Sequence, residues 1–128
     1  MPKTIKPLIY RSLIDPLLSS LRAGVLLNIA PGESVIDIAC GNGTLAFEIA
    51  GIAKDVTAID LDDEMIAYAK SKKTKLNRPN ISFTTADASD LSSFQAKKFT
   101  TAVTTMAIHQ FNPDLALKVL SEMKRVAH

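Results

Sequence analysis

Residues 34–44, which read SVIDIACGNGT, are the stretch that decides the fold. Their first half is short, largely apolar and rich in β-branched residues, which is typical of a strand buried in a parallel sheet. Gly41 and Gly43 predict a tight turn, because glycine has no Cβ atom to restrict the backbone. Beyond the turn, four apolar residues recur at helical spacing: Ala46, Ile49, Ala50 and Ala53. The stretch therefore predicts a strand, a turn and a helix.

The rest of the chain repeats this alternation in both directions. Further strands are expected at residues 56–59, 81–85 and 99–106, and helices before residue 31, after Asp62 and after Asn112. Asp62 and Asn112 are predicted helix caps. The inner face of the last helix is expected to comprise Ala116, Val119, Leu120, Met123 and Ala127. Strands that alternate with helices predict an α/β fold with a Rossmann-like, doubly wound parallel sheet of about four strands and flanking helices.

Length and composition exclude several classes of protein. The 128 residues fit one domain, with residues 1–33 as a helical lead-in and 34–128 as the α/β core. The net charge is +2 and the basic residues form no single block, so no DNA partner is expected. No apolar run is long enough for a membrane span. The lone cysteine, Cys40, cannot form an internal disulfide, which favours a cytoplasmic location. No residues have metal-ligand spacing.

Candidate site residues follow the ends of the strands, where ligands bind in doubly wound sheets. The glycine turn would let a ligand lie against the backbone, and Asp60 would accept hydrogen bonds from both hydroxyls of a ribose. Asp87 would accept from an adenine amine. His109 would position a substrate or accept a proton. Each candidate also has a simpler interpretation: the glycines form a turn without a ligand, the two acids are solvated, and the histidine is a packing residue. Cys40 is interpreted as a packing residue because no partner for nucleophilic chemistry lies near it in the sequence.

Four segments together resemble class I S-adenosylmethionine-dependent methyltransferases. They are VIDIACGNGT at 35–44, Asp60, ADA at 86–88 and AIHQF at 107–111. The acid within the first strand, Asp37, makes the resemblance specific. The resemblance implies a sheet with strand order 3-2-1-4. It also implies methyl transfer with S-adenosylmethionine as cofactor and S-adenosylhomocysteine as product. Residues 10–18, YRSLIDPLL, are similar to the lead-in of small-molecule and lipid methyltransferases, which implies a small-molecule acceptor.

The resemblance also implies roles for individual residues. The glycine turn faces the methionine part of the cofactor, Leu61 packs on adenine, and Tyr10 and His109 contact the substrate, with His109 as the candidate catalytic base. The cofactor-binding residues are expected to be Asp37, Ala39, Gly41, Asn42, Gly43, Asp60, Leu61, Asp87, Ala88 and Met106.

The sequence departs from the family pattern at two points. Thr100 stands where family members commonly carry an acid. Family members also continue past the last helix with a further strand and a closing hairpin, whereas this chain ends at Arg125-Val126-Ala127-His128, so we expect a fragment or an unusually small relative. A truncated sheet would leave the fourth strand as an exposed edge, which predicts self-association as a homodimer, either through that edge or by apolar contact of the last helix.

Two other functions remain open at this point. Residues 41–46, GNGTLA, also satisfy a loose G-x-G-x-x-A pattern, and Asp60 suits the ribose of a dinucleotide, so an NAD-binding oxidoreductase is one alternative. The other is a module that binds a cofactor without catalysis.

Overall fold

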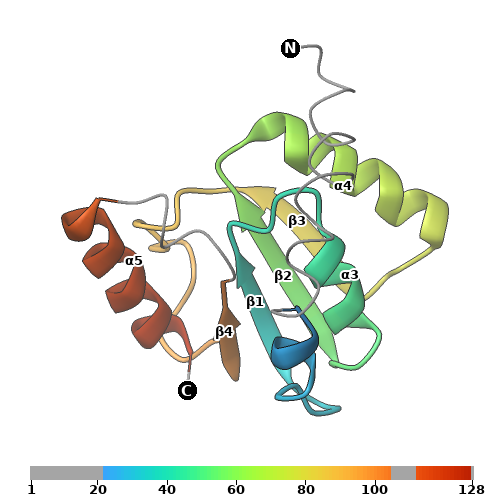
Figure 1. Cartoon of the computed structure of the whole chain (residues 1–128), viewed down its shortest axis with the longest axis horizontal. Helices are drawn as coiled ribbons and strands as arrows, with labels where there is room; N and C mark the ends of the chain where they lie inside the picture. Colours follow the sequence, from blue (N-terminus) through green and yellow to red (C-terminus); the bar gives the residue numbers. More distant parts are fainter. Residues whose placement is uncertain (1–21, 105–111, 128) are drawn as a thin grey trace.

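The computed structural model describes residues 22–104 and 112–127. Its four parallel strands are β1 (Ser34–Ile38), β2 (Asp55–Asp60), β3 (Ile81–Thr85) and β4 (Thr101–Val103), in the order β3-β2-β1-β4 (Figure 1). The predicted fold class and strand order are confirmed. The division of the chain at residue 33 stays a prediction. No helix in the described ranges is long and apolar enough to cross a membrane.

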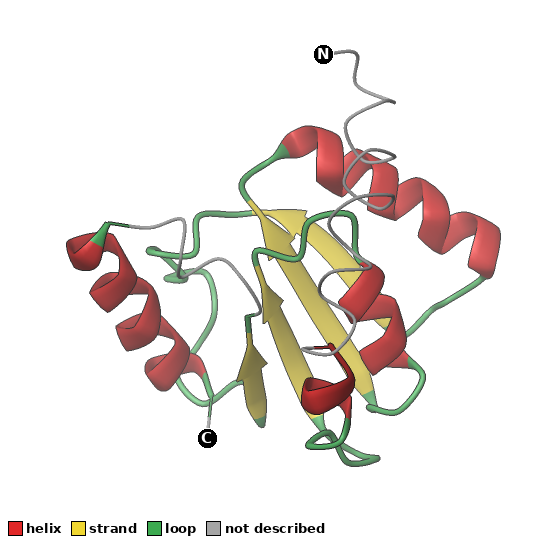
Figure 2. Cartoon of the chain, in the orientation of Figure 1, coloured by secondary structure: helices red, strands yellow, loops and turns green. Residues whose placement is uncertain are grey.

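Helices pack against both faces of this sheet. α3 (Thr44–Ala50) and α4 (Asp63–Leu76) cover one face, and α5 (Pro113–Val126) lies beside β4 (Figure 2), with its buried side chains in the cluster on the other face. Side chains alternate along β1, so Val35 joins the cluster beneath α3 and α4, whereas Ile36 and Ile38 join the cluster beneath α5. All three are fully buried. A strand buried on both faces explains the continuous apolar run in the sequence.

The two predicted caps are confirmed. The Asp62 carboxylate accepts hydrogen bonds from the backbone N–H groups of Glu64 and Met65, at 2.9 and 3.4 Å, where α4 begins. The Asn112 side chain accepts from Leu115 N at 2.8 Å, and proline follows at the start of α5. Both helices therefore begin where the local sequence satisfies their free N–H groups.

The fourth strand is shorter than the sequence predicted. The ladder with β1 covers only Thr101 to Val103, and the preceding Phe99 instead forms an isolated parallel bridge with Ala127. Val103 pairs with Asp37, one residue before β1 ends at Ile38. The expected span of 99–106 is therefore wrong at its start, and residues 105 and 106 lie outside the described part.

Thr100 ties the start of β4 to the start of β1. Its N–H donates to Ser34 O at 2.8 Å, and its hydroxyl oxygen accepts from Ser34 N at 3.0 Å. The Glu33 carboxylate accepts from the neighbouring Thr101 hydroxyl. Glu33, the residue directly before β1, thus supplies a carboxylate at the start of the fourth strand.

The inner face of α5 differs from the predicted one at Leu120 and at its end, where Val126 is buried and Ala127 lies beyond the helix. Val119 and Val126 are fully buried and Met123 packs beside them, but Leu120 is 48% exposed. Val119, Met123 and Val126 are four and three residues apart and form a narrow apolar seam, through which the helix contacts the sheet near β4. Leu120 is turned about 100° from Val119 and falls outside the seam.

Candidate functional site

The turn after β1 is built from residues in the left-handed backbone region. Ala39, Gly41 and Gly43 have φ angles of 59°, 58° and 89°. Only glycine adopts these angles freely, and an alanine there costs about 1–2 kcal/mol. The strain at Ala39 is held in place because Cys40 N donates to Ile59 O at 2.8 Å, across the junction of β1 and β2. Strained backbone of this kind is concentrated at functional sites.

The absent side chain of Gly43 faces the core. A Cβ atom there would lie 3.0 Å from two ring carbons of Phe83 and 3.2 Å from the Phe47 ring. The sequence indicated that the glycines make room for a ligand. At Gly43 the room is taken by two phenylalanines, so its backbone is the part that remains for a ligand to contact.

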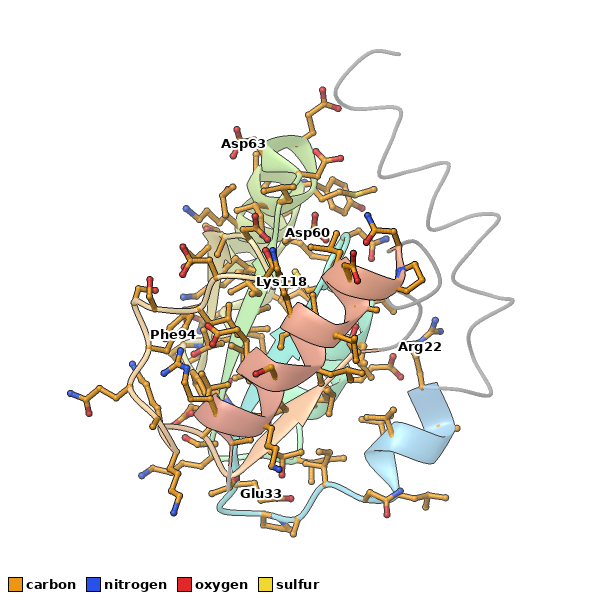
Figure 3. The ribbon with its side chains drawn as sticks, turned by 90° about the vertical axis from the view of Figure 1, so that its left-hand side faces the viewer. Arg22, Glu33, Asp60, Asp63, Phe94 and Lys118 are labelled. Atoms are coloured by element: carbon orange, nitrogen blue, oxygen red, sulfur yellow. The ribbon has the colours of Figure 1, made fainter. Side chains whose placement is uncertain are left out.

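Asp60, the last residue of β2, fixes the glycine turn. Its Oδ2 accepts from Gly41 N at 2.9 Å and its Oδ1 accepts from Asp62 N at 2.8 Å. Asp60 lies at the carboxyl end of the sheet, opposite the end marked by Glu33 (Figure 3). Each carboxylate oxygen has a second lone pair, so both can still accept from an outside donor.

Asp37 is a buried acid without a complete set of partners. It is 2% exposed, and its Oδ2 has no hydrogen-bond partner among the described residues. Burial, together with the negative charge of Asp60, raises the pKa of Asp37 to about 8. The structure therefore brings two predicted site residues, Asp37 and Asp60, into electrostatic contact beneath one turn.

The same surroundings make Cys40 unreactive. Burial raises the pKa of its thiol, and the charges of Asp37 and Asp60 raise it further. Because the thiolate is the nucleophilic form, this cysteine is held in the form that does not attack. The structure thus supports the interpretation of Cys40 as a packing residue.

The loop after β3 begins beside Asp60, where β3 ends two residues before Asp87. Asp60 and Thr85 are neighbours in the β2–β3 ladder, and Ala86 N donates to Asp60 O at 3.0 Å. The Asp87 carboxylate accepts from the hydroxyl and the N–H of Ser89, at 2.7 and 2.9 Å, both at Oδ1. These bonds hold the pKa of Asp87 below its usual value, so the group is ionised.

Three other predicted residues are placed in different ways. Leu61, directly after Asp60, is 71% exposed and available to a planar ligand. Ala88 packs against the cluster beneath α5. Asn42 is 1% exposed and its Oδ1 accepts from both the N–H and the hydroxyl of Thr44, so its side chain orders the start of α3.

The predictions for Tyr10, Met106 and His109 lie outside the described residues. Sequence reasoning missed Thr104, which directly follows β4. Its hydroxyl is buried and has no hydrogen-bond partner within the described ranges. A threonine in a β-branched run is typical of a strand, so the only signal available was its position at a strand end.

The arrangement favours a cationic ligand over a phosphate. A phosphate site needs free backbone N–H groups at the turn. Here the N–H of Gly41 donates to Asp60, that of Gly43 to Cys40 O, and that of Thr44 to Asn42. The negative charge of Asp60 would also repel an anion placed against the turn.

Comparison with known proteins identifies relatives of this chain. Residues 35–128 match the family model described as "Methyltransferase domain". The chain is 33% identical over 100 residues to a demethylmenaquinone methyltransferase of Beutenbergia cavernae, which covers 78% of this chain and 38% of that protein. It is 32% identical over 84 residues to a ubiquinone biosynthesis O-methyltransferase of Xanthomonas campestris, covering 66% of this chain and 34% of that one.

A solved structure shares the fold. The SAM-dependent methyltransferase from Aquifex aeolicus superimposes with a TM-score of 0.78 and 26% sequence identity, over 94% of this chain and 66% of that protein. The chain spans a little over one third of the length of the two curated relatives, at 38% and 34%.

Proposed function

This chain belongs to the class I S-adenosylmethionine-dependent methyltransferase family, and from that premise we propose that it transfers the cofactor's methyl group to a small-molecule acceptor. Two relatives are named for the methylation of quinones or their precursors, which supports a small aromatic acceptor. The absence of a DNA partner and the cytoplasmic location stay predictions from the sequence.

The observation that carries the proposal is the acidic turn. The buried Oδ2 of Asp37, which has no hydrogen-bond partner among residues 22–104 and 112–127, lies beneath a turn that Asp60 holds through Gly41. The cofactor carries an ammonium and a sulfonium group, so its charge complements these acids. Asp60 would accept from the ribose hydroxyls, Leu61 would cover the adenine ring and Asp87 would accept from the adenine amine, as the resemblance implies.

The alternative of an NAD-binding oxidoreductase is not favoured. A dinucleotide would have to place its pyrophosphate against the turn, where the N–H groups of Gly41 and Gly43 are already used. Parallel calorimetric titrations with NAD and S-adenosylmethionine separate the two, and we expect heat of binding with the second only.

The protein's own contribution to methyl transfer is orientation. When bound, the cofactor's sulfonium supplies an already activated methyl group. The rigid turn and the acids at the strand ends would hold the donor in place, so that an acceptor can approach in line while water is excluded. His109 is the proposed base for the acceptor's proton, and a His109→Asn variant with an unchanged transfer rate would remove it from that role.

The proposed function is tested by separating binding from turnover. Calorimetry with S-adenosylhomocysteine measures the cofactor site. Transfer of a labelled methyl group to reduced quinones and simple phenols measures catalysis. We expect both to be positive for the 128-residue chain. Binding without transfer to any acceptor would instead support the alternative of a non-catalytic cofactor-binding module.

Asp60→Ala is expected to weaken binding of S-adenosylhomocysteine by about 1.5–3 kcal/mol, the scale of a lost hydrogen bond to a charged group. The loss has two sources, the missing acceptor and the released Gly41 N–H. Asp55→Ala, at the other end of the same strand, is the matched control and should bind normally. Unchanged affinity in a folded Asp60→Ala protein would contradict the assignment.

We also propose that the 128-residue chain self-associates, either through the outer edge of β4 or through α5. Among the described residues, only the bridge between Phe99 and Ala127 pairs on that side of the fourth strand. On α5, Leu117 and Leu120 are 66% and 48% exposed. Both features favour contact with a second copy.

Sedimentation over a wide concentration range is the test, and a dimer at high concentration is expected. A Leu117→Lys/Leu120→Lys variant separates the two modes: it becomes monomeric if α5 is the contact and stays dimeric if the strand edge is. A wild-type protein that remains monomeric throughout would contradict the proposal.

A further inference from the structure

The loop after β3 is held by an ion pair on α5. Arg125 donates from Nη2 to Leu91 O at 2.7 Å and from Nη1 to Phe94 O at 2.9 Å. Glu122 Oε2 accepts from Leu91 N at 2.6 Å. The two side chains also bond to each other, with Arg125 Nε 2.9 Å from Glu122 Oε1. Phe94 lies beside α5 in Figure 3.

This pair adds hydrogen bonds to a loop that is also held by the apolar packing of Ala88, Leu91 and Phe94 in the cluster beneath α5. The loop forms no regular helix or strand between β3 and β4, and its polar side chains bond mainly to their own neighbours, as Ser89 does to Asp87. Leu91 is fully buried in the cluster beneath α5. The Arg125 hydrogen bond lowers the pKa of Glu122, so both partners are charged. Charge-assisted bonds of this kind are stronger than neutral ones.

The contacts of Glu122 and Arg125 with Leu91 are close in sequence to Asp87, the predicted partner of the adenine amine. Only residues 88–90 separate Asp87 from Leu91, and Asp90 N donates back to Asp87 O at 3.0 Å. The contacts to Asp87's side chain from described residues all go to Oδ1, so Oδ2 is left for an outside donor. A shift of Leu91 would therefore pass directly to Asp87.

We propose that Glu122 and Arg125 are positioning residues for adenine recognition: they hold the loop so that the Asp87 carboxylate meets the exocyclic amine of the cofactor. The inference rests on the proposed cofactor site and extends it to two side chains on α5 that need not contact the cofactor. Its consequence is selectivity between bases, and not stability alone.

The test compares S-adenosylhomocysteine with S-inosylhomocysteine, in which an oxygen replaces the amine. The wild-type protein is expected to prefer the adenosyl compound by roughly 10- to 100-fold, the scale of one charge-assisted hydrogen bond. Arg125→Met, measured by calorimetry below its unfolding temperature, is expected to lose at least about fivefold of that preference. Glu122→Gln is a second variant of nearly equal size, in case Arg125→Met does not fold.

Glu48→Gln is the matched control, because it removes the charge from a second arginine–glutamate pair of the described residues, in which Arg22 Nε lies 2.8 Å from Glu48 Oε1. We expect it to lower stability without changing the preference. A lowered melting temperature with an unchanged preference in both α5 variants would overturn the inference, since the pair would then be purely structural. If the wild-type protein binds neither compound, the cofactor assignment fails and the inference fails with it.

Discussion

Asp37→Asn is expected to stabilise the cofactor-free protein by a few kcal/mol at pH 8–9. The folded protein raises the pKa of this carboxyl from 3.8 to about 8, chiefly by burial. The folded state therefore binds the proton more tightly than the unfolded state does. Stability from this group is present in acid and is lost as the pH rises from about 4 to about 8, at a scale of about 1.4 kcal/mol per pKa unit. Asparagine cannot ionise, so the stability of Asp37→Asn does not fall with pH through this group.

Denaturant unfolding at pH 5 and pH 9 checks this expectation. The wild-type protein should lose more stability between the two pH values than Asp37→Asn does. Asp55→Asn, on the partly exposed start of β2, is the control and should follow the wild type. If wild type and Asp37→Asn lose stability in parallel, Asp37 is not the titrating group.

The same carboxyl should couple cofactor binding to proton release. A cation bound at the turn would lower the pKa of Asp37 again, because an opposite charge favours the ionised form. Between about pH 6 and pH 8, binding should then strengthen with rising pH. Titrations in buffers of different ionisation enthalpy measure the released proton. Asp37→Asn should release none and bind more weakly.

Gly43→Ala is expected to cost roughly 2–5 kcal/mol of stability, the sum of backbone strain and overpacking. The residue has a φ of 89°, and its new Cβ would meet the rings of Phe83 and Phe47 at 3.0 and 3.2 Å. Those rings already pack on each other with centroids 5.3 Å apart, so they have little room to move.

Gly32→Ala is the matched control. Gly32 has almost the same φ, 90°, but a Cβ atom there would have nothing within 4 Å. Strain alone should cost about 1–2 kcal/mol at this position. Denaturant unfolding of the two variants isolates the packing contribution as their difference. If both variants lose the same free energy of unfolding, the rings of Phe83 and Phe47 move aside without a measurable loss of stability.

Much of the site could be predicted because it lies at strand ends. Asp60 is the last residue of β2 and Asp87 lies two residues after β3, and parallel strands bring their carboxyl ends to one edge. The roles of Glu122 and Arg125 could not be predicted this way. They lie about thirty residues from Leu91 in the sequence, and only the packing of α5 brings them to it.

The sequence by itself determined the order of strands and helices, the caps at Asp62 and Asn112 and, through the resemblance, the family. These features depend on the period of apolar residues and on side chains that bond within a few residues, so a local pattern contains them. Only the tertiary structure decided that Leu120 is exposed, that β4 ends at Val103 and that Asp37 carries a raised pKa. Exposure, strand length and pKa depend on which neighbours the fold brings together, and those neighbours are distant in the sequence.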